Sequence, residues 1–490
     1  MLVATRRSTR SLIALACAVV VTNDASAQLS RSLPDSFSDK EFWEFFSTMS
    51  EDGGSFPSEN FVSNEQTYQY VIPTLQRSLS PNGVYLGVGP EQNFTYIANI
   101  KPRMAVIFDI RRQNAMAHLM YKALFELSST RAEFVAKLFS RPLPASVGPS
   151  ATANEMFTAA LNAKMSDSAF DANRKTIFDD LVGKHGFVLT TADSQSIKHV
   201  YSSFFEAGPD INYGYRFGGS GTFRPMYSTY AQIQTLTNVD GVNMAFLANE
   251  ANFQYLRDLH KKNLIIPVVG DFAGPKAIRG VGDYLKQRHA TVSAFYLSNV
   301  EQYLFRGFDD ASRFYKNVET LPIDSTSTFI RSVPPNSGFG GMLSIVTSPG
   351  MSFGSSPLTN NYYSVQVIDS LGVSIILTTS DSAGKPVTTR TVDTSKANRP
   401  SALDIFRRLR ARDDSLARVR ADSTQRALGP VTGVLRDSSI TGGGRISVVG
   451  NTGTLLSGLA SIRETLDAFS SGRLPSYIAL TAMTKTDGWK

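Results

Sequence analysis

The sequence predicts an α/β protein built on a doubly wound, mostly parallel sheet, and two observations support this class. Residues 84–109 read as an apolar strand, a glycine turn, a short helix and a second apolar strand that ends at an aspartate. Further along, apolar stretches at 264–269 and 292–297 flank a helix expected over about 275–288. Strands that alternate with helices favour right-handed crossovers, and these make neighbouring strands parallel.

The first of these units has the order of half a nucleotide-binding site. Its first strand ends at Gly87-x-Gly89, a helix is expected over 91–100, and the second strand leads to Asp109. Asp109 follows Gly89 by twenty positions. Such folds place a ribose-binding carboxylate at about this distance from the glycine turn.

The segments before the first strand are predicted to be helical. Ser38-x-x-Glu41 has the spacing of a capping box, and apolar residues follow at helical spacing up to Met49. The segment 58–76 suggests a second helix, broken near Pro73. We therefore expect a helical lead-in that covers one face of the sheet.

Helices are also predicted after the second strand. Apolar residues recur at helical spacing over 114–127 and 130–139. The next residues, 143–262, are more than a plain crossover needs, and they include a passage rich in glycine, tyrosine and phenylalanine. We interpret 143–262 as a helical insertion between the second and third strands of a main domain that spans 28–335.

The pattern changes after residue 335, where the sequence predicts a strand-rich and partly low-complexity C-terminal insertion over 336–454. Short segments alternate apolar residues with serine and threonine, which is typical of antiparallel strands. These segments are 342–348, 362–369, 372–379 and 386–393. Residues 395–428 are polar and read as a solvated helix or linker, or as a basic amphipathic anchor. A helical segment over 455–490 is expected to rejoin the main domain.

The first 27 residues have the three parts of a secretory signal peptide. Arg6, Arg7 and Arg10 precede an apolar run over 12–21, and a small-residue cleavage pattern ends at Ala27. The run is too short for a stable bilayer anchor, and no later apolar run reaches the roughly 18 residues that a span needs. Cleavage near Ala27 therefore predicts an extracytoplasmic protein, periplasmic or secreted, without a transmembrane segment in the mature chain.

The single cysteine, Cys17, lies inside this apolar run. Cleavage after Ala27 would leave a mature chain without thiols, which excludes disulfides and thiolate chemistry. The alternative is a lipid-modified N-terminus at Cys17, after Ala14-Leu15-Ala16.

Composition excludes several classes of function. The formal charge is +7, and loss of the signal, with three arginines and one aspartate, lowers it to +5. This is a mild excess without a dense basic face, so we expect no nucleic-acid partner. The five histidines lack a paired helical spacing and no G-x-S-x-G occurs, so neither a metal site nor a serine hydrolase is predicted. The glycine-rich residues 218–222 resemble a phosphate loop without its lysine, and a flexible turn is the alternative.

Candidate site residues gather where the predicted strands end, since parallel sheets bind ligands at their carboxyl ends. Glycines there permit close approach of a ligand, the helix after Gly89 offers free amides, and Asp109 can accept hydrogen bonds from vicinal hydroxyls. The candidates for cofactor or ligand binding are Gly87, Gly89, Glu91, Gln92, Asn93, Asp109, Asp271 and Ser298, and those for catalysis are Asn299 and Glu301.

Each candidate also has a structural interpretation. Asp109 and Asp271 could be helix N-caps, and Asn299 could cap the helix that begins near Val300. Residues 91–93 could line a pocket or start a helix. Four further residues could stack on a ligand or belong to an aromatic lid, namely Tyr213, Tyr215, Arg216 and Tyr227. His118 and His260 read as ordinary helix residues.

Four segments carry a resemblance to a known fold: YLGVGPEQNFTYI, AVIFDIRRQN, IIPVVGDFAG and FYLSNVEQYLF. The chain resembles the class I S-adenosylmethionine methyltransferases and, more closely, an uncharacterised bacterial secreted family with a methyltransferase-like, Rossmann-like domain. The resemblance implies S-adenosylmethionine as a possible cofactor. It also implies a role for each matching position: the cofactor glycine loop for Gly87 and Gly89, the ribose acid for Asp109, the adenine edge for Asp271, and the substrate-side motif for Ser298-Asn299-Val300.

Two functions are compatible with these residues. The preferred one is an exported, non-catalytic protein that binds a small molecule or associates with the envelope. The alternative is an S-adenosylmethionine-dependent methyltransferase or related transferase, in which Asn299 or Glu301 positions the acceptor. Export favours the first, because S-adenosylmethionine is a cytoplasmic metabolite. Asn299 is also followed by Val300-Glu301 rather than by the Pro-Pro-aromatic motif of many methyltransferases that act on nitrogen.

Overall fold

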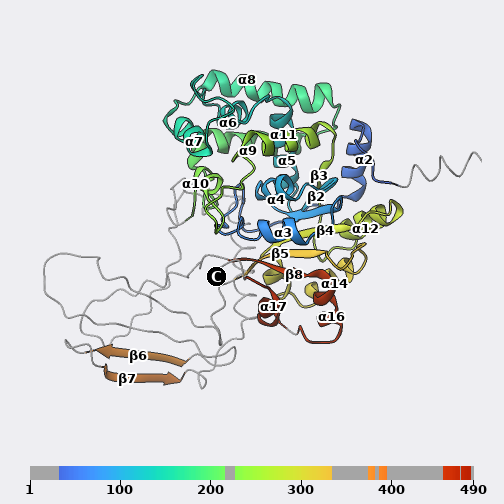
Figure 1. Cartoon of the computed structure of the whole chain (residues 1–490), viewed down its shortest axis with the longest axis vertical. Helices are drawn as coiled ribbons and strands as arrows, with labels where there is room; N and C mark the ends of the chain where they lie inside the picture. The colour runs from blue at the N-terminus through green and yellow to red at the C-terminus, as the bar shows by residue number, and fades with distance from the viewer. Residues whose placement is uncertain are drawn as a thin grey trace, which may run out of the picture. The chain divides into compact units, whose positions relative to one another are not determined.

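A computed structural model describes residues 32–215, 227–333, 374–380, 386–393, 456–474 and 476–486 (Figure 1). Several predictions fall outside these residues. They are the signal peptide, Arg216, the glycine-rich residues 218–222, the strands at 342–348 and 362–369, and the polar segment 395–428.

The chain divides into two compact units. The larger contains residues 1–334 and 454–490, and the smaller contains 335–453. In the smaller unit, strands β6 (Ser374–Ser380) and β7 (Pro386–Asp393) form an antiparallel pair. Two of the four strands predicted for this region therefore exist, at nearly the expected positions.

The larger unit is built on a six-stranded sheet of order β3-β2-β1-β4-β5-β8. Its strands are β1 (Val84–Val88), β2 (Met104–Asp109), β3 (Ile265–Val269), β4 (Val292–Ser298), β5 (Thr328–Val333) and β8 (Leu456–Ser461). The first five pair in parallel, and β8 is antiparallel to β5. The predicted α/β class with a mostly parallel sheet is confirmed.

The C-terminal segment differs from its prediction in one respect. It was expected to be helical from its start at residue 455, but it begins with β8, and its helices are α16 (Ile462–Ser470) and α17 (Tyr477–Met483). The pairing of β8 with β5 brings this segment to the edge of the main sheet, across more than a hundred intervening residues.

Helices occupy both faces of the sheet. One group is α3 (Ile72–Ser78), α4 (Gln92–Ile100), α5 (Arg112–Glu126) and α11 (Glu250–Lys261), and a second is α2 (Asp39–Met49), α12 (Ala277–Gln287), α13 (Val300–Leu304) and α14 (Asp310–Val318). Within each group the helices pack against one another. Right-handed crossovers on either side of β1 place the two groups on opposite faces.

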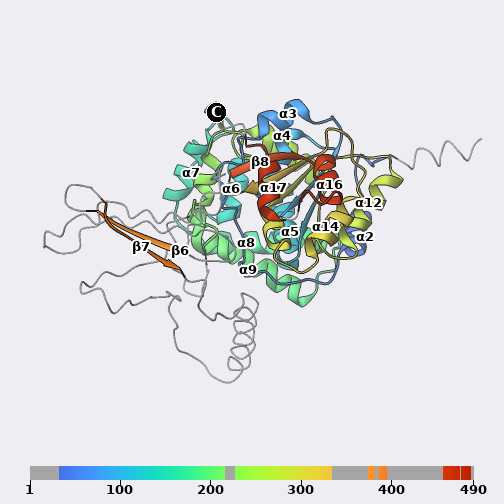
Figure 2. The same ribbon diagram turned by 90° about the horizontal axis from the view of Figure 1, so that it is seen from below.

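The predicted insertion between β2 and β3 is helical. Within 143–262 it contains α7 (Ala153–Asn162), α8 (Asp167–Phe178), the π-helical turn η1 (Asp179–Lys184), α9 (Thr191–Ala207), the 3-10 turn η2 (Gly208–Asp210), α10 (Tyr230–Thr235) and α11. The helix predicted separately over 130–139 is α6 (Arg131–Phe139). These helices gather at the top of Figure 1, whereas α14, α16 and α17 lie at the bottom. Seen from below, α16 and α17 lie in front of the sheet (Figure 2).

The lead-in to β1 is only partly helical. α2 forms with the predicted capping box between Ser38 and Glu41. The helix predicted over 58–76 is wrong, because regular structure starts only with α3 at Ile72, where Pro73 stands in the first turn. Residues 50–71 instead form an irregular segment, which we call the N-terminal loop.

Three strands of the larger unit are buried from end to end. All five residues of β1, all six of β2 and all five of β3 are buried. This is the expected burial for parallel strands that helices cover on both faces. Among the described residues, no helix is long and apolar enough to cross a membrane.

Candidate functional site

A cavity of about 200 Å³ lies at the carboxyl ends of the parallel strands. Its lining comes from the ends of β1, β2, β3 and β4 and from the N-terminal loop. The sheet order reverses between β1 and β4, and open α/β sheets bind ligands at such a switch point. Of the predicted site residues, the lining includes Gly89, Asp109, Asp271, Ser298 and Asn299.

Glycine is needed at the two positions of the turn for different structural reasons. A Cβ on Gly87 would lie 1.9 Å from Asn93 Oδ1, so this glycine makes room for a side chain of the protein itself. Gly89 has a φ of +77°, which glycine adopts without strain, and a Cβ there would meet only Asn60, at 3.8 Å. Gly87 was predicted to contact a ligand, but it does not line the cavity.

Two polar side chains, Asn93 and His118, donate hydrogen bonds to backbone carbonyls of the glycine turn. Asn93 accepts a hydrogen bond from the Tyr85 hydroxyl at 2.9 Å and donates to the carbonyls of Val88 and Pro90. His118 Nε2 donates to the Gly89 carbonyl at 2.9 Å, and burial lowers the pKa of His118 to about 4. His118 is therefore a neutral helix residue that anchors the turn.

Asp109 is paired within the protein. Arg111 donates to both of its carboxylate oxygens, at 3.0 and 2.7 Å, and the Arg111 amide donates to Oδ1 at 2.8 Å. Both side chains are almost fully buried. Arg111 also donates to the carbonyls of Ser58 and Glu59, which ties the N-terminal loop to β2. Asp109 is not a helix N-cap, and the proposed ribose acid already binds a guanidinium.

Asp271, like Asp109, is not a helix N-cap; its side chain caps a turn. Its Oδ1 accepts from the Ala273 amide at 2.9 Å. The amides at the start of α12 are taken by Glu51, whose Oε1 accepts from Lys276 and Ala277, each at 2.7 Å. A carboxylate of the N-terminal loop thus occupies the helix start that would otherwise attract an anion.

Glu91 and Gln92 are buried beneath the N-terminal loop and do not line the cavity. Gln92 donates to Glu65 Oε2 at 2.8 Å and to the Tyr96 hydroxyl at 3.2 Å. Burial raises the pKa of Glu91 to about 8, although amides of Glu91 and Ser63 partly oppose this. Glu91, Gln92 and Asn93 therefore all contact protein groups inside the fold, and their predicted ligand-binding roles stay predictions.

Glu65 is the site residue that the sequence did not reveal. Its side chain lines the cavity, yet the residue is only 1% exposed. Oε1 accepts hydrogen bonds from the Tyr296 hydroxyl at 2.8 Å and from Ser298 Oγ at 2.6 Å, and Oε2 accepts from Gln92. All three donors are neutral, and among the described residues no cationic side chain forms an ion pair with Glu65.

The end of β4 supplies the opposite wall. Ser298 has a φ of +50°, a left-handed backbone that is rare for residues other than glycine. Asn299 stands at the start of α13 but makes no capping bond, and its side chain donates to Gln302 at 3.4 Å. Asn299 therefore occupies the N-cap position of α13 without a side-chain capping bond, and it lines the cavity.

Glu301 faces the core and does not line the cavity. Its two carboxylate oxygens accept from Arg331, at 2.5 and 2.9 Å, and Oε1 also accepts from the Tyr315 hydroxyl at 2.7 Å. The Glu301 and Arg331 side chains are 3% and 1% exposed. This carboxylate is therefore saturated by a buried ion pair, and its predicted role in positioning an acceptor stays a prediction.

Aromatic side chains complete the lining. Phe56, Tyr213, Phe272, Tyr296 and Tyr303 face the cavity. Outside the lining, Tyr227 packs edge to face on Tyr213 with ring centres 5.2 Å apart, and Tyr215 donates to Glu206 at 2.8 Å. Of the predicted aromatic group, Tyr213 therefore contacts the cavity, and the other described members pack on the protein.

The lining combines acidic, aromatic and polar side chains. Its ionisable acids are Glu65, Asp109 and Asp271, and its one described cation is Arg111. The cavity thus has an excess of negative charge, aromatic walls and several hydroxyl or amide groups. Such a lining fits a small ligand with a positive charge or several hydrogen-bond donors.

A family model described as a domain of unknown function (DUF7790) matches residues 60–348. This range is more than half of the chain. The chain belongs to this family. The matched residues include β1 to β5, and so every strand end around the cavity. No curated protein is similar enough to the chain to match it.

Proposed function

We propose that this protein binds a small organic cation in the cavity at the switch point and does not catalyse a reaction on it. One observation carries the proposal. Glu65 is a buried carboxylate that lines the cavity and has only neutral donors around it. Because an unpaired charge is costly to bury, a cationic group in the cavity would stabilise it.

The other cavity walls support the same ligand chemistry. Asp271 adds a second carboxylate that has no ion pair with a described residue, while Asp109 and Arg111 neutralise each other. Tyr213, Tyr296 and Tyr303 present aromatic surface. Cations bind over aromatic rings with about 0.5 to 2 kcal/mol of stabilisation, and carboxylates add to this.

We infer the absence of cofactor-dependent catalysis from the protein groups that already occupy the predicted cofactor positions. Asp109 is held by Arg111, Asn93 fills the space beside Gly87, and Glu51 occupies the amides of α12. The cavity volume of about 200 Å³ also lies below the roughly 300 to 1,000 Å³ of most pockets for larger ligands. These features favour a compact ligand over a nucleotide-sized cofactor.

A second candidate is S-adenosylmethionine-dependent transfer. Gly89, Asp109, Asp271, Ser298 and Asn299 all line one cavity, as the resemblance to methyltransferases requires. The parallel strand order 3-2-1-4-5 is compatible with a Rossmann-like nucleotide-binding fold. The sulfonium of S-adenosylmethionine is also a cation, so Glu65 could face it. For this ligand to bind, Arg111 would have to release Asp109.

We also propose that the protein acts outside the cytoplasm, after cleavage near Ala27. The basic start, the apolar run and the small-residue pattern support export. An envelope-associated or secreted binding protein would then meet its ligand outside the cell, where S-adenosylmethionine is scarce.

The test is a calorimetric titration of the mature chain, residues 28–490, with four probes. Choline is a compact cation, S-adenosylmethionine is a large cation, and S-adenosylhomocysteine and adenosine lack the sulfonium. We expect saturable choline binding that Glu65→Gln weakens about 10- to 100-fold, the value of a charge-assisted contact. Glu59→Gln is the matched control, because Glu59 belongs to the same loop but does not line the cavity.

Other outcomes decide between the candidates. Micromolar binding of S-adenosylmethionine that Asp109→Ala abolishes would replace the first proposal by the second. Equal binding of adenosine and S-adenosylmethionine, unaffected by Glu65→Gln, would overturn the cation proposal. Failure of both cations to bind would do the same.

A further inference from the structure

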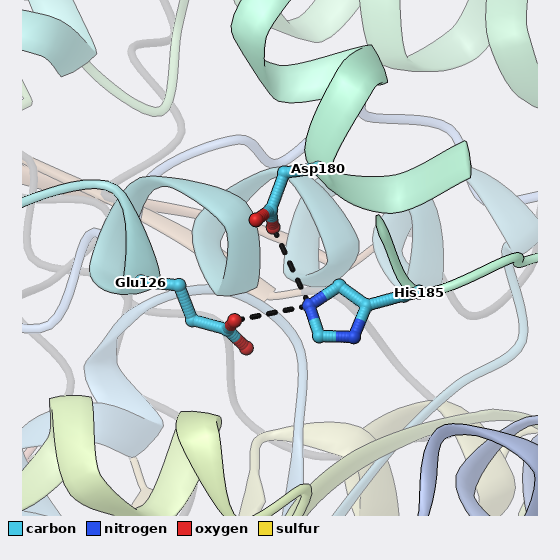
Figure 3. A group of neighbouring side chains, drawn as sticks. All are labelled: Glu126, Asp180 and His185. Atoms are coloured by element: carbon cyan, nitrogen blue, oxygen red, sulfur yellow. Dashed lines mark hydrogen bonds and ion pairs between the residues drawn. The ribbon is translucent and has the colours of Figure 1, made fainter. Parts of the chain in front are cut away.

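A second group of polar residues lies far from the cavity. Glu126 is the last residue of α5, Asp180 belongs to the π-helical turn η1, and His185 follows that turn directly. α5 begins at Arg112, near the cavity edge of the sheet, and its fifteen residues extend about 21 Å away from it. Figure 3 shows both carboxylates pointing at the same ring nitrogen of His185.

The distances between these three side chains suit a bound metal ion. His185 Nε2 lies 3.0 Å from Glu126 Oε2 and 3.5 Å from Asp180 Oδ2. All three atoms lie within 4.8 Å of one another. Ligand atoms around a tetrahedral zinc ion, with bonds of about 2.0 to 2.1 Å, are about 3.3 Å apart.

One atom of the group lacks a hydrogen bond. Asp180 is only 5% exposed, and its Oδ2 is buried without a hydrogen-bond partner among the described residues. This oxygen points at His185 Nε2 (Figure 3). The oxygen lies 3.5 Å from this nitrogen, and a cation between the two atoms would give the oxygen a closer partner.

The surrounding residues orient the histidine as metal sites do. Asp39 Oδ1 lies 2.6 Å from His185 Nδ1, so that nitrogen donates to the carboxylate and Nε2 faces Glu126 and Asp180. Asn263 in turn donates to Asp39 Oδ1 at 2.9 Å. A carboxylate behind a histidine fixes the ring and makes it a better ligand. The π-helical turn that carries Asp180 is a rare backbone form, often found at functional positions.

Two lysines provide positive charge in the metal-free form. Lys122 donates to Glu126 Oε1 at 2.6 Å, and Lys184 donates to Glu126 Oε2 and, at 3.0 Å, to Asp180 Oδ1. Lys122 is buried, whereas the Lys184 side chain is 56% exposed.

We propose that Glu126, Asp180 and His185 bind a divalent zinc-class ion, with the exposed Lys184 leaving as the ion enters. The ion takes the place of the Lys184 ammonium, and His185 binds it through an unprotonated Nε2. Lys122 and Asp39 keep their places. A nitrogen and two carboxylate oxygens are a suitable donor set for zinc, and water completes the four ligands.

The experiment measures zinc binding to the tag-free mature chain after chelator treatment, with a chromophoric zinc indicator as competitor. We expect one ion per chain, and cobalt bound in its place should show the strong visible absorption of four-coordinate Co²⁺. Asp180→Asn should weaken zinc at least tenfold. Asp179→Asn is the matched control, since the neighbouring Asp179 is exposed and pairs with Lys175 instead.

Lys184→Ala separates a metal site from an ion network. If Lys184 competes with the ion, its removal should tighten zinc binding severalfold while circular dichroism shows an unchanged fold. The proposal is overturned if neither the unmodified chain nor Lys184→Ala binds zinc saturably, or if Asp180→Asn and Asp179→Asn bind it equally well.

Discussion

Two regions near the end of β4 each contain a buried glutamate, and the two glutamates differ in the charge of their partners. In the core, Glu301 is matched by Arg331 and Tyr315, so its charge is neutralised within the protein. In the cavity wall, Glu65 receives hydrogen bonds from Tyr296, Ser298 and Gln92, which carry no charge.

The difference separates a structural carboxylate from a ligand-binding one. In a buried ion pair the two charges neutralise each other, so the carboxylate has no free charge with which to bind a ligand. A carboxylate held only by neutral donors has no cationic partner within the protein, so a cationic ligand in the cavity can pair with it. The pairing of each acid, rather than its position after a strand, therefore indicates its role.

The largest effect is expected from breaking the core pair. Glu301→Gln leaves the Arg331 guanidinium buried without its counter-charge, which should lower the free energy of unfolding by about 3 to 5 kcal/mol. The same change at Glu65 should cost only about 1 kcal/mol, because a neutral amide can keep most of the hydrogen bonds. Urea denaturation of both variants measures the contrast.

A double variant checks the cause. Glu301→Leu with Arg331→Met removes both charges and should recover most of the stability lost in Glu301→Gln. If Glu301→Gln and Glu65→Gln destabilise the protein equally, the distinction between the two regions is mistaken.

Glu91 is a third buried glutamate, with neither an ion pair nor a place in the cavity lining. Its pKa is raised by burial from 4.5 to about 8. A raised pKa means that the folded protein holds the proton more tightly, so stability should fall as pH rises from about 4.5 to 8. The loss should be on the order of 3 kcal/mol at pH 7.

Glu91→Gln removes this dependence. The variant should be more stable than the unmodified protein at pH 7 and nearly equal to it at pH 5. Denaturation curves at both pH values measure the difference, and parallel pH profiles for the two proteins would contradict the assignment.

The smallest effect concerns the glycine turn. Gly87→Ala should destabilise the protein by about 1 to 3 kcal/mol, because its Cβ would collide with Asn93 Oδ1. Gly89→Ala should cost about 1 kcal/mol through its positive φ alone. Thermal denaturation compares them. A larger effect at Gly89 than at Gly87 would mean that the turn is not packed as described.

Local patterns in the sequence predicted much of the sheet. β1 to β4 are short, mostly apolar runs next to glycine, proline or polar residues, and this pattern reflects burial on both faces. β5 was missed because Arg331 interrupts its apolar run. That arginine can be buried only because Glu301, thirty residues away, faces it. β8 was read as helical because its pairing partner β5 lies far away in the sequence.

The sequence indicated the sheet edge at which the cavity lies, but it did not indicate the loop residues that help to form the site. Asp109, Asp271, Ser298 and Asn299 follow strands, so their meeting at one edge of the sheet could be inferred. Glu65 and Glu51 come from a loop that was expected to be helical in part. The serines, asparagines and Pro57 of that loop were the available signal against a helix.

The sequence by itself determined the α/β class, the mostly parallel sheet and the sheet edge at which the candidate site residues would gather. These features depend on burial and backbone preference, which repeat over a few neighbouring residues. Only the tertiary structure decided which acids are paired: Asp109 with Arg111, Glu301 with Arg331, and Glu65 with neutral donors. Most of these partners are distant in the chain, and the electrostatic energy of a buried charge depends on what surrounds it in space.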